Sequence, residues 1–206
     1  KGEVVCTVKG MGMYKRRPAL RTPFVHYPLP HAGEGRATQP EKNDKETSTM
    51  RTIASLEELE SLQGEEVAVS DWIEITQQQV NLFAEATGDH QWIHIDVERA
   101  KRESPFGAPI AHGFLTLSLL PQLMQNAIHM EGVKMGVNYG LNRVRFTSPV
   151  PVGSRLRGRV KLLKVERLDP LPNGLVGAQS TWEVTIEREG ADRPVCVAES
   201  ISRRYS

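Results

Sequence analysis

The chain has 206 residues, of which 39% are hydrophobic and 25% charged, the composition of an ordinary globular protein with enough apolar surface for one core. The formal net charge is only +1, so nothing in the overall charge points to a nucleic-acid-binding protein. The two cysteines, Cys6 and Cys196, are too few for a disulfide framework or a cysteine-rich metal site.

No stretch of the sequence reaches the roughly eighteen uninterrupted apolar residues that a membrane-spanning helix needs. The N-terminus also lacks the apolar region of a secretory signal. We therefore expect a cytoplasmic protein that contacts neither a membrane nor a nucleic acid.

Residues 1–49 differ in character from the rest of the chain. They hold nine Lys and Arg against five Asp and Glu, and five prolines interrupt them. We predict a disordered or non-native N-terminal extension, a natural start at Met50 and a single domain over residues 50–206. A targeting peptide is the competing interpretation, but transit peptides are poor in acidic residues. A nucleic-acid role for the basic cluster at residues 15–17 has neither a regular helix nor an aromatic platform to support it.

Two capping boxes predict helices in the first part of the domain. Ser55 begins the pattern Ser-Leu-Glu-Glu, which predicts a short helix that ends near Gly64. Thr76 begins Thr-Gln-Gln-Gln, which predicts a second helix that ends at Gly88. Between the two we expect a strand over residues 67–75.

A longer helix is expected after a polar loop, in which Asp96 caps a short helix that runs through Arg102. Residues 114–124 are apolar on nearly every side, which predicts a helix enclosed by other structure. Pro121 should bend this helix or remove one hydrogen bond, and we expect the helix to end near residues 130–132.

The remaining sequence predicts an antiparallel sheet. Apolar and polar residues alternate in long segments separated by turns rich in Pro, Gly and Asn. The four strands are expected at residues 135–146, 155–168, 175–188 and 194–205. An enclosed helix followed by such a sheet is typical of an α+β fold in which a curved sheet wraps a long central helix.

The loop after Gly88 carries three ionisable side chains, on Asp89, His90 and His94. A carboxylate and an imidazole can hold one water together, the carboxylate taking its proton and the imidazole orienting it, as the addition of water to a double bond requires. In a plainer interpretation, Asp89 caps the loop and His94 is a hydrogen-bonded histidine near the core. We expect His90 to point to solvent.

The segment Pro109-Ile-Ala-His-Gly113 leads directly into the apolar helix. Backbone N–H groups at a helix start lack partners and carry the positive end of the dipole, so Gly113 can bring one close to a carbonyl oxygen that gains charge. Alternatively, Gly113 only allows a tight turn, with His112 as a cap or a packing residue.

Together these segments carry a family resemblance. Gly88-Asp-His-Gln-Trp-Ile-His94, followed by Pro109-Ile-Ala-His-Gly-Phe114, resembles the hydratase-2 motif of MaoC-like dehydratases. With Asn138-Tyr-Gly-Leu-Asn-Arg-Val-Arg-Phe146, the chain resembles the subgroup named for nodulation protein N. The resemblance extends over nearly all of residues 55–205, and it rests on two linked motifs at the expected separation.

The resemblance implies a homodimer of hot-dog subunits that acts as an (R)-specific enoyl-CoA hydratase. The implied reaction adds water reversibly to a trans-2-enoyl thioester of coenzyme A or acyl carrier protein and gives the (3R)-3-hydroxyacyl thioester. No metal and no redox cofactor are implied. The residues at the matching positions are Asp89 and His94 to hold and activate the water, the Gly113 N–H to polarise the thioester carbonyl, and Gln91, His112 and Phe114 to bind substrate.

The chain departs from the family pattern at three places. Gln91 and Trp92 stand where many members have Asn and Pro, and Pro121 stands where some have a small hydroxyl residue that helps to bind the water. Ser118 lies one helical turn before Pro121 and would face differently. Because of these departures, the water and the substrate pocket are expected to differ from those of other family members.

Two other functions use the same features. A hot-dog thioesterase would hydrolyse the thioester with a nearby carboxylate, and a non-catalytic acyl-thioester-binding protein would keep the fold without turnover.

The arginines between residues 143 and 159 have two interpretations. They form the wet face of a sheet in the simpler interpretation, or a basic rim for the coenzyme A phosphates in the other.

Overall fold

The computed structural model describes residues 50–206, and the extension expected at residues 1–49 lies outside the described part. Strand β1 (Arg51–Ile53) precedes helix α1 (Leu56–Ser61). The Ser55 hydroxyl accepts the Glu58 N–H at 3.2 Å, and the Glu58 carboxylate accepts the Ala54 N–H at 2.8 Å. The first predicted cap is therefore confirmed.

Strands β2 (Glu66–Val69) and β3 (Ile73–Glu74) replace the single strand expected over residues 67–75. Both pair with β6, but the chain leaves the ladder between them. The reason lies at Ser70, whose hydroxyl accepts the Gly158 N–H at 2.8 Å and so takes the place of a backbone acceptor.

Helix α2 (Gln77–Thr87) has the predicted capping box at Thr76 and ends at Gly88, whose φ of 76° is in the left-handed region. Helix α3 (Trp92–Ile95) and helix α4 (Val97–Glu103) follow. The Asp96 carboxylate accepts the Arg99 N–H at 3.0 Å, as the predicted cap requires.

The long apolar helix is split into α5 (Gly113–Ser118) and α6 (Leu120–Ala127). We expected Pro121 to bend the helix or to remove one hydrogen bond, and instead the helix is divided next to Pro121, which stands in the first turn of α6 where its missing N–H costs little. The predicted end near residues 130–132 is wrong. Residues 128–130 form strand β4 (Ile128–Met130), which pairs in parallel with β1, a long-range contact that the local apolar pattern does not reveal.

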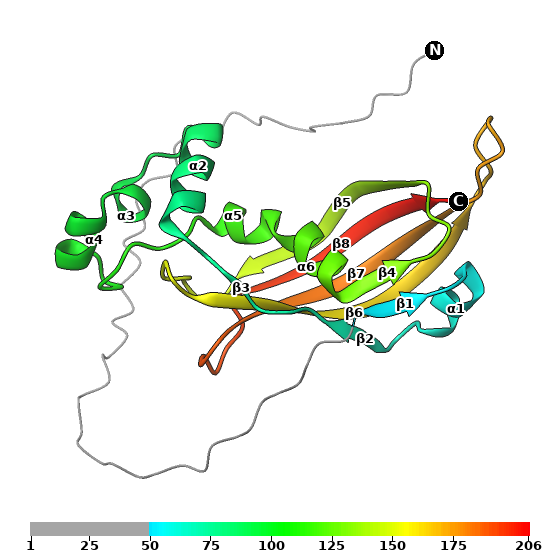
Figure 1. Cartoon of the computed structure of the whole chain (residues 1–206), viewed down its shortest axis with the longest axis horizontal. Helices are drawn as coiled ribbons and strands as arrows, with labels where there is room; N and C mark the ends of the chain where they lie inside the picture. The colour runs from blue at the N-terminus through cyan, green and yellow to red at the C-terminus, as the bar shows by residue number, and fades with distance from the viewer. Residues whose placement is uncertain (1–49) are drawn as a thin grey trace, which may run out of the picture. The chain divides into compact units, whose positions relative to one another are not determined.

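Four long strands complete the fold: β5 (Met135–Phe146), β6 (Arg155–Leu168), β7 (Gly177–Arg188) and β8 (Cys196–Tyr205). The order in the sheet is β2-β6-β7-β8-β5, every long neighbour is antiparallel, and β5 lies at the edge. In Figure 1 the curved sheet passes beneath α5 and α6. This is the predicted α+β arrangement of a hot-dog fold.

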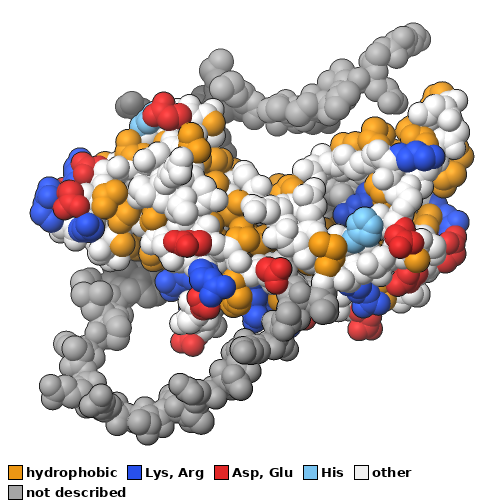
Figure 2. Space-filling view, in the orientation of Figure 1, with side chains coloured by type: hydrophobic (Ala, Val, Ile, Leu, Met, Phe, Trp, Pro, Cys, Tyr) orange, Lys and Arg blue, Asp and Glu red, His pale blue; other side chains and the backbone are white. Residues whose placement is uncertain are grey.

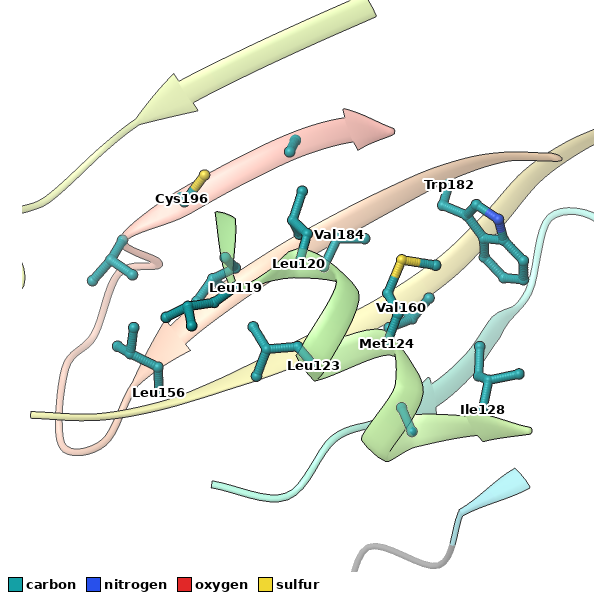
Figure 3. Packing of buried hydrophobic residues seen from close by; sticks show 14 of the residues in the cluster. Leu119, Leu120, Leu123, Met124, Ile128, Leu156, Val160, Trp182, Val184 and Cys196 are labelled. Atoms are coloured by element: carbon teal, nitrogen blue, oxygen red, sulfur yellow. The ribbon is translucent and has the colours of Figure 1, made fainter. Parts of the chain in front are cut away.

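The core lies between α6 and the sheet (Figure 3). Leu123 and Trp182 are fully buried, and a Cβ at Gly158 would lie 3.3 Å from the Leu123 Cβ, so this glycine lets the helix approach the sheet closely. Cys196 is also fully buried, and burial raises the pKa of its thiol to about 11.

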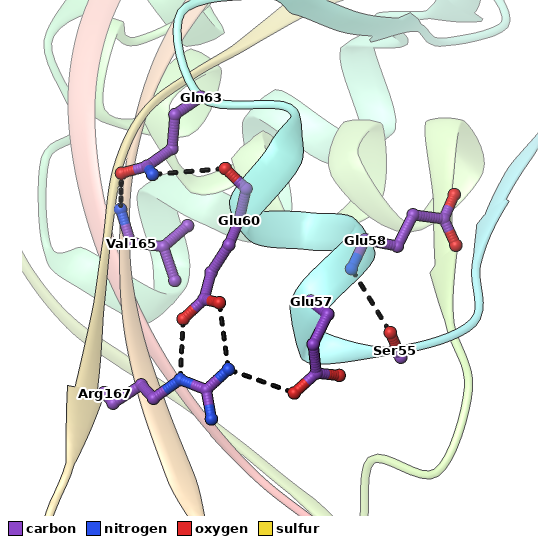
Figure 4. A network of polar contacts seen from close by, with 7 residues as sticks. All are labelled: Ser55, Glu57, Glu58, Glu60, Gln63, Val165 and Arg167. Atoms are coloured by element: carbon purple, nitrogen blue, oxygen red, sulfur yellow. Dashed lines mark hydrogen bonds and ion pairs between the residues drawn. The ribbon is translucent and has the colours of Figure 1, made fainter.

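The outer face of the sheet carries ion pairs. Arg155 pairs with Glu189 at 2.9 Å and Arg157 pairs with Glu187 at 2.8 Å. Farther along β6, one arginine holds α1 against the sheet through two glutamates, as Figure 4 shows for Arg167, Glu57 and Glu60. The pairs of Arg155 and Arg157 support the interpretation of these arginines as a wet face rather than a phosphate rim.

Charged side chains gather at the two ends of the face seen in Figure 2, around α4 and around α1, and along its lower edge. Hydrophobic and uncharged side chains cover the stretch between them, over α5 and α6. Within residues 50–206, each helix is too short or too polar to cross a membrane.

Candidate active site

Asp89 lies in the loop that follows α2, and His94 lies in the short helix α3. Asp89 is exposed, whereas His94 is only 7% exposed. The Gln77 amide donates to the His94 carbonyl at 2.8 Å and to Asn81 at 2.8 Å, which fixes α3 against α2. The buried imidazole is thus held on a rigid support while the carboxylate meets solvent.

Two histidine rings are stacked beside this carboxylate. Nδ1 of His94 donates to the Ile110 carbonyl at 2.7 Å, and Nε2 of His112 donates to the Asp89 carbonyl at 2.9 Å. The ring centroids of His94 and His112 are 3.8 Å apart, with planes inclined by 29°. Because a backbone carbonyl accepts from one nitrogen of each ring, the lone pair of the neutral form is on the other nitrogen, Nε2 in His94 and Nδ1 in His112.

The structure brings the predicted reactive pair together. One side-chain oxygen or nitrogen from each of Asp89, His94 and His112 lies within 4.8 Å of the other two. One water molecule can bridge groups at that separation. A metal ion suits the arrangement less well, because it would have to lie in the planes of two stacked rings at once to meet both lone pairs.

Electrostatics favour a neutral His94. Burial lowers the pKa of His94 because the charged ring would be poorly solvated, and the neighbouring His112 lowers it further. The hydrogen bond to Ile110 and the charge of Asp89 act in the opposite direction. At neutral pH the His94 lone pair is therefore available to accept a hydrogen bond.

Gly113 follows His112 and is the first residue of α5. The helix start has no side-chain cap, so the Gly113 N–H has no intrahelical partner there. A Cβ at this position would lie 3.0 Å from the Phe146 ring, which explains why glycine fits. His112 thus connects the two parts of the site, because it precedes Gly113 in the chain and its ring stacks on that of His94.

The three predicted substrate-binding residues differ in position. Gln91 is exposed at the start of α3 and makes no capping hydrogen bond, and Phe114 is 68% exposed, with its ring edge-on to Phe146 at 5.8 Å. His112 is only 3% exposed and is engaged with His94 and the Asp89 backbone. His90 is exposed, as expected, and lies 3.7 Å from Glu85.

The departures from the family pattern occupy distinct places. The Trp92 ring lies beneath the Arg99 guanidinium at 4.3 Å, toward α4. The Ser118 hydroxyl donates to the Phe114 carbonyl at 2.7 Å, and Pro121 is half-buried in α6. Thr116, three residues after Gly113, is buried, and its hydroxyl donates to the His112 carbonyl at 3.4 Å.

Sequence patterns do not single out three residues that support the site. Gln77 holds α3, Ile110 fixes the tautomer of His94 through its carbonyl, and Phe146 packs on Gly113. Gln77 belongs to the capping-box segment, where it resembles any helix-surface residue. The other two act through backbone or packing contacts that leave no periodic signal.

Comparisons with known proteins agree with this geometry. A family model described as a MaoC like domain matches residues 58–184. The 3-hydroxyacyl-thioester dehydratase Z of Mycobacterium tuberculosis is 56% identical over 154 residues, which cover 75% of this chain and 98% of that protein. Nodulation protein N of Rhizobium leguminosarum is 47% identical over 151 residues, which cover 72% of this chain and 89% of that protein.

A solved structure shares the fold. The (R)-hydratase from A. caviae involved in PHA biosynthesis superposes with a TM-score of 0.53 at 22% identity, over 67% of this chain and 95% of that one. At this level of identity the likeness concerns the arrangement of helices and strands.

Proposed function

The chain belongs to the MaoC-like dehydratase family and is an enzyme of the hydratase or dehydratase type, and on this premise we propose that it is an (R)-specific enoyl-CoA hydratase. It adds water reversibly to trans-2-enoyl thioesters and yields (3R)-3-hydroxyacyl thioesters. One observation carries the proposal: a carboxylate oxygen of Asp89 and an imidazole nitrogen of His94 lie within 4.8 Å of each other, next to a helix start without a side-chain cap.

In the proposed mechanism, Asp89 and His94 hold one water. Nε2 of neutral His94 accepts a hydrogen bond from it, and the Asp89 carboxylate takes a proton as the water oxygen bonds to C3 of the substrate. The proton then passes to C2, so that the elements of water are added across the double bond. Dehydration follows the same path in reverse.

Gly113 supports the electronic part of this reaction. As the oxygen adds to C3, negative charge moves through C2 to the thioester oxygen, where the Gly113 N–H donates a hydrogen bond. The absence of a side chain lets Phe146 close on one side of this amide. We assign Gln91 and Phe114 to the substrate mouth on their exposure and His112 to its wall.

The acyl carrier is coenzyme A or acyl carrier protein in this proposal, and the place of action is the cytoplasm. The name of the M. tuberculosis relative refers to 3-hydroxyacyl thioesters in general, which supports the substrate class. The proposal requires no metal and no redox cofactor.

The test follows two signals in one reaction. The protein is mixed with a short trans-2-enoyl-CoA, and the absorbance of the conjugated double bond and the release of free thiol are both recorded. We expect the double bond to disappear without thiol release. Thiol release with the double bond intact would replace hydration by the thioesterase alternative. If the double bond persists and no thiol is released, the protein is a non-catalytic acyl-thioester binder.

A homodimer is the proposed functional unit, and strand β5 supports it. This strand is at the sheet edge, paired only with β8 in the described part of the chain, yet apolar side chains along it are exposed. Val137 is 42% exposed, Tyr139 54% and Leu141 45%. A long apolar edge strand is normally covered, and antiparallel pairing with β5 of a second copy would cover it and extend the sheet.

A further inference from the structure

A cavity of about 540 Å³ lies between helices α5 and α6 and strands β5 and β8. This distal cavity is lined by Leu117, Leu120 and Met124 from the helices and by Asn138, Ser202 and Arg204 from the strands, among others. Its helix side is mostly apolar, as an acyl chain requires, with Ser118 and Gln125 as its polar residues, whereas its strand side carries hydrogen-bond donors. A purely aliphatic chain would leave those donors without a partner.

Arg204 is a half-buried cation for which residues 50–206 supply no carboxylate partner. Its Nη1 contacts the Met130 sulfur, and its guanidinium lies 5.8 Å from the centroid of the Trp182 ring. Burial lowers the pKa of this guanidinium. Glu131 borders a second cavity, of about 250 Å³, that Arg204 also lines, but the two form no ion pair within the described chain. A desolvated cation of this kind destabilises the fold unless an anion joins it.

Two further polar side chains line the distal cavity together with Arg204. Ser202 precedes Arg204 by two residues on β8, so both face the helices, and Asn138 is opposite Ser202 on β5. The Ser202 hydroxyl is buried without a hydrogen-bond partner in the described part of the chain. The guanidinium lies 5.8 Å from the Trp182 ring, and Trp182 is opposite Ser200, so the Arg204 side chain extends along β8 in the direction of Ser202. Three side chains that can donate hydrogen bonds therefore line the strand side of the distal cavity.

The distal cavity follows the proposed active site along the chain. Its helix side begins at Leu117, about one helical turn after Gly113, and continues across the break between α5 and α6 to Gln125. A long acyl chain whose thioester oxygen meets the Gly113 N–H can follow α5 into this cavity and bring its far end toward Arg204.

We propose that the distal cavity binds an acyl chain that ends in a carboxylate, with Arg204 as the ion-pair partner and Ser202 and Asn138 as hydrogen-bond donors. The inference rests on the proposed function and names a substrate class for it, enoyl thioesters with a second, terminal carboxylate. A carboxylate accepts hydrogen bonds at two oxygens and matches the planar guanidinium fork, which accounts for donors that a methyl terminus would leave unpaired.

The experiment compares pairs of trans-2-enoyl-CoA substrates of equal chain length that end in either a methyl group or a carboxylate. The ratio of their kcat/KM values is measured from short to long chains for the full chain, for R204M and for R155M. Arg155 is the matched control, because it is exposed on the outer face of the sheet and pairs with Glu189. For long chains we expect the natural sequence and R155M to prefer the carboxylate by about tenfold or more, and R204M to lose that preference.

Folding is monitored with the same variants. Since R204M removes a cation without a partner, we expect its melting temperature to equal or exceed that of the natural sequence. R204K keeps the charge but not the fork, and we expect it to retain part of the preference. Equal kcat/KM ratios for the natural sequence and R204M at every chain length would overturn the proposal that Arg204 binds a carboxylate of the substrate.

Free dicarboxylates distinguish the source of the anion. If free adipate or suberate raises the melting temperature of the natural sequence but not of R204M, the cavity binds carboxylates that are not attached to the substrate, and the proposed chemistry of the site stands. If R204M changes neither the preference for substrates with a terminal carboxylate nor the response of the melting temperature to free dicarboxylates, the proposal is wrong. A protein that hydrates no enoyl thioester but keeps this dicarboxylate response would refute the proposed function and leave the carboxylate site intact.

Discussion

The imidazole of His112 lies flat against that of His94, and each ring gives one N–H to a backbone carbonyl. The Ile110 carbonyl fixes which nitrogen of His94 carries the lone pair. The stacked His112 lowers the pKa of His94 by electrostatic repulsion. The Ala-His-Gly segment thus acts on His94 as well as leading into α5.

The first prediction concerns pH and stability. The pKa of His94 lies below its ordinary value of 6.5, so below pH 6.5 the unfolded chain binds this proton more readily than the folded chain. The contribution of His94 to stability is present above pH 6.5 and is lost as the pH falls toward the lowered pKa. Urea unfolding at a series of pH values should show this loss, and H94N should flatten it. Identical pH dependence in both proteins would contradict the prediction.

The second prediction concerns Asp89. We expect D89N to lower kcat for hydration by about 10²–10⁴-fold, because the amide cannot take the proton of the water. Since Asp89 is exposed, the melting temperature should change little. E85Q, an exposed acid on α2, serves as the matched control and should leave kcat within about twofold. Full activity in D89N would remove the carboxylate from the mechanism.

The third prediction concerns the contact between Gly113 and Phe146. A methyl group at Gly113 would lie 3.0 Å from the ring, so G113A must displace Phe146, and we expect a stability loss of about 1–3 kcal/mol together with lower kcat. The double variant G113A/F146L should recover much of the stability, because leucine leaves room for the methyl group. Thermal unfolding and kcat of the single and double variants check this, and additive effects would argue against the contact.

The fourth prediction concerns the domain boundary. Deletion of residues 1–49 should leave kcat and KM for hydration unchanged, because each residue assigned to the site lies within residues 50–206. Steady-state kinetics of the shortened and full chains provide the measurement. A loss of activity on deletion would require a new assignment of the domain.

The fifth prediction concerns the edge strand. Sedimentation equilibrium should give the mass of two copies, and V137K should shift the population toward one copy, since an edge lysine opposes strand pairing. L82K replaces another exposed apolar side chain, on α2, and should not change the mass. A natural sequence that sediments as a single copy would rule out the proposed dimer.

Local chemistry made part of the fold predictable. The caps at Ser55, Thr76 and Asp96 depend on residues within three positions, and strands β5 and β6 follow from alternation and turn residues. Strand β4 was not predictable, because its partner β1 lies far away in the sequence and its apolar residues also suit a helix.

The candidate site also has features that the sequence predicts and features that it does not. Its motif identified Asp89, His94 and Gly113, and the structure brings the two side chains together. The stacking of His112 on His94 and the closure of Phe146 on Gly113 depend on how distant segments pack, so a motif cannot express them. The donors around Arg204 come from two strands and left no sequence signal.

The buried thiol of Cys196 has a practical consequence for separating hydration from thioester hydrolysis. With its pKa raised to about 11 and its side chain shielded, it will remain largely unreactive toward disulfide reagents in the native protein at neutral pH. Cys6 is the other cysteine of the chain. A C6S variant therefore gives a colourless background, against which any chromophore released by a disulfide reagent measures coenzyme A alone.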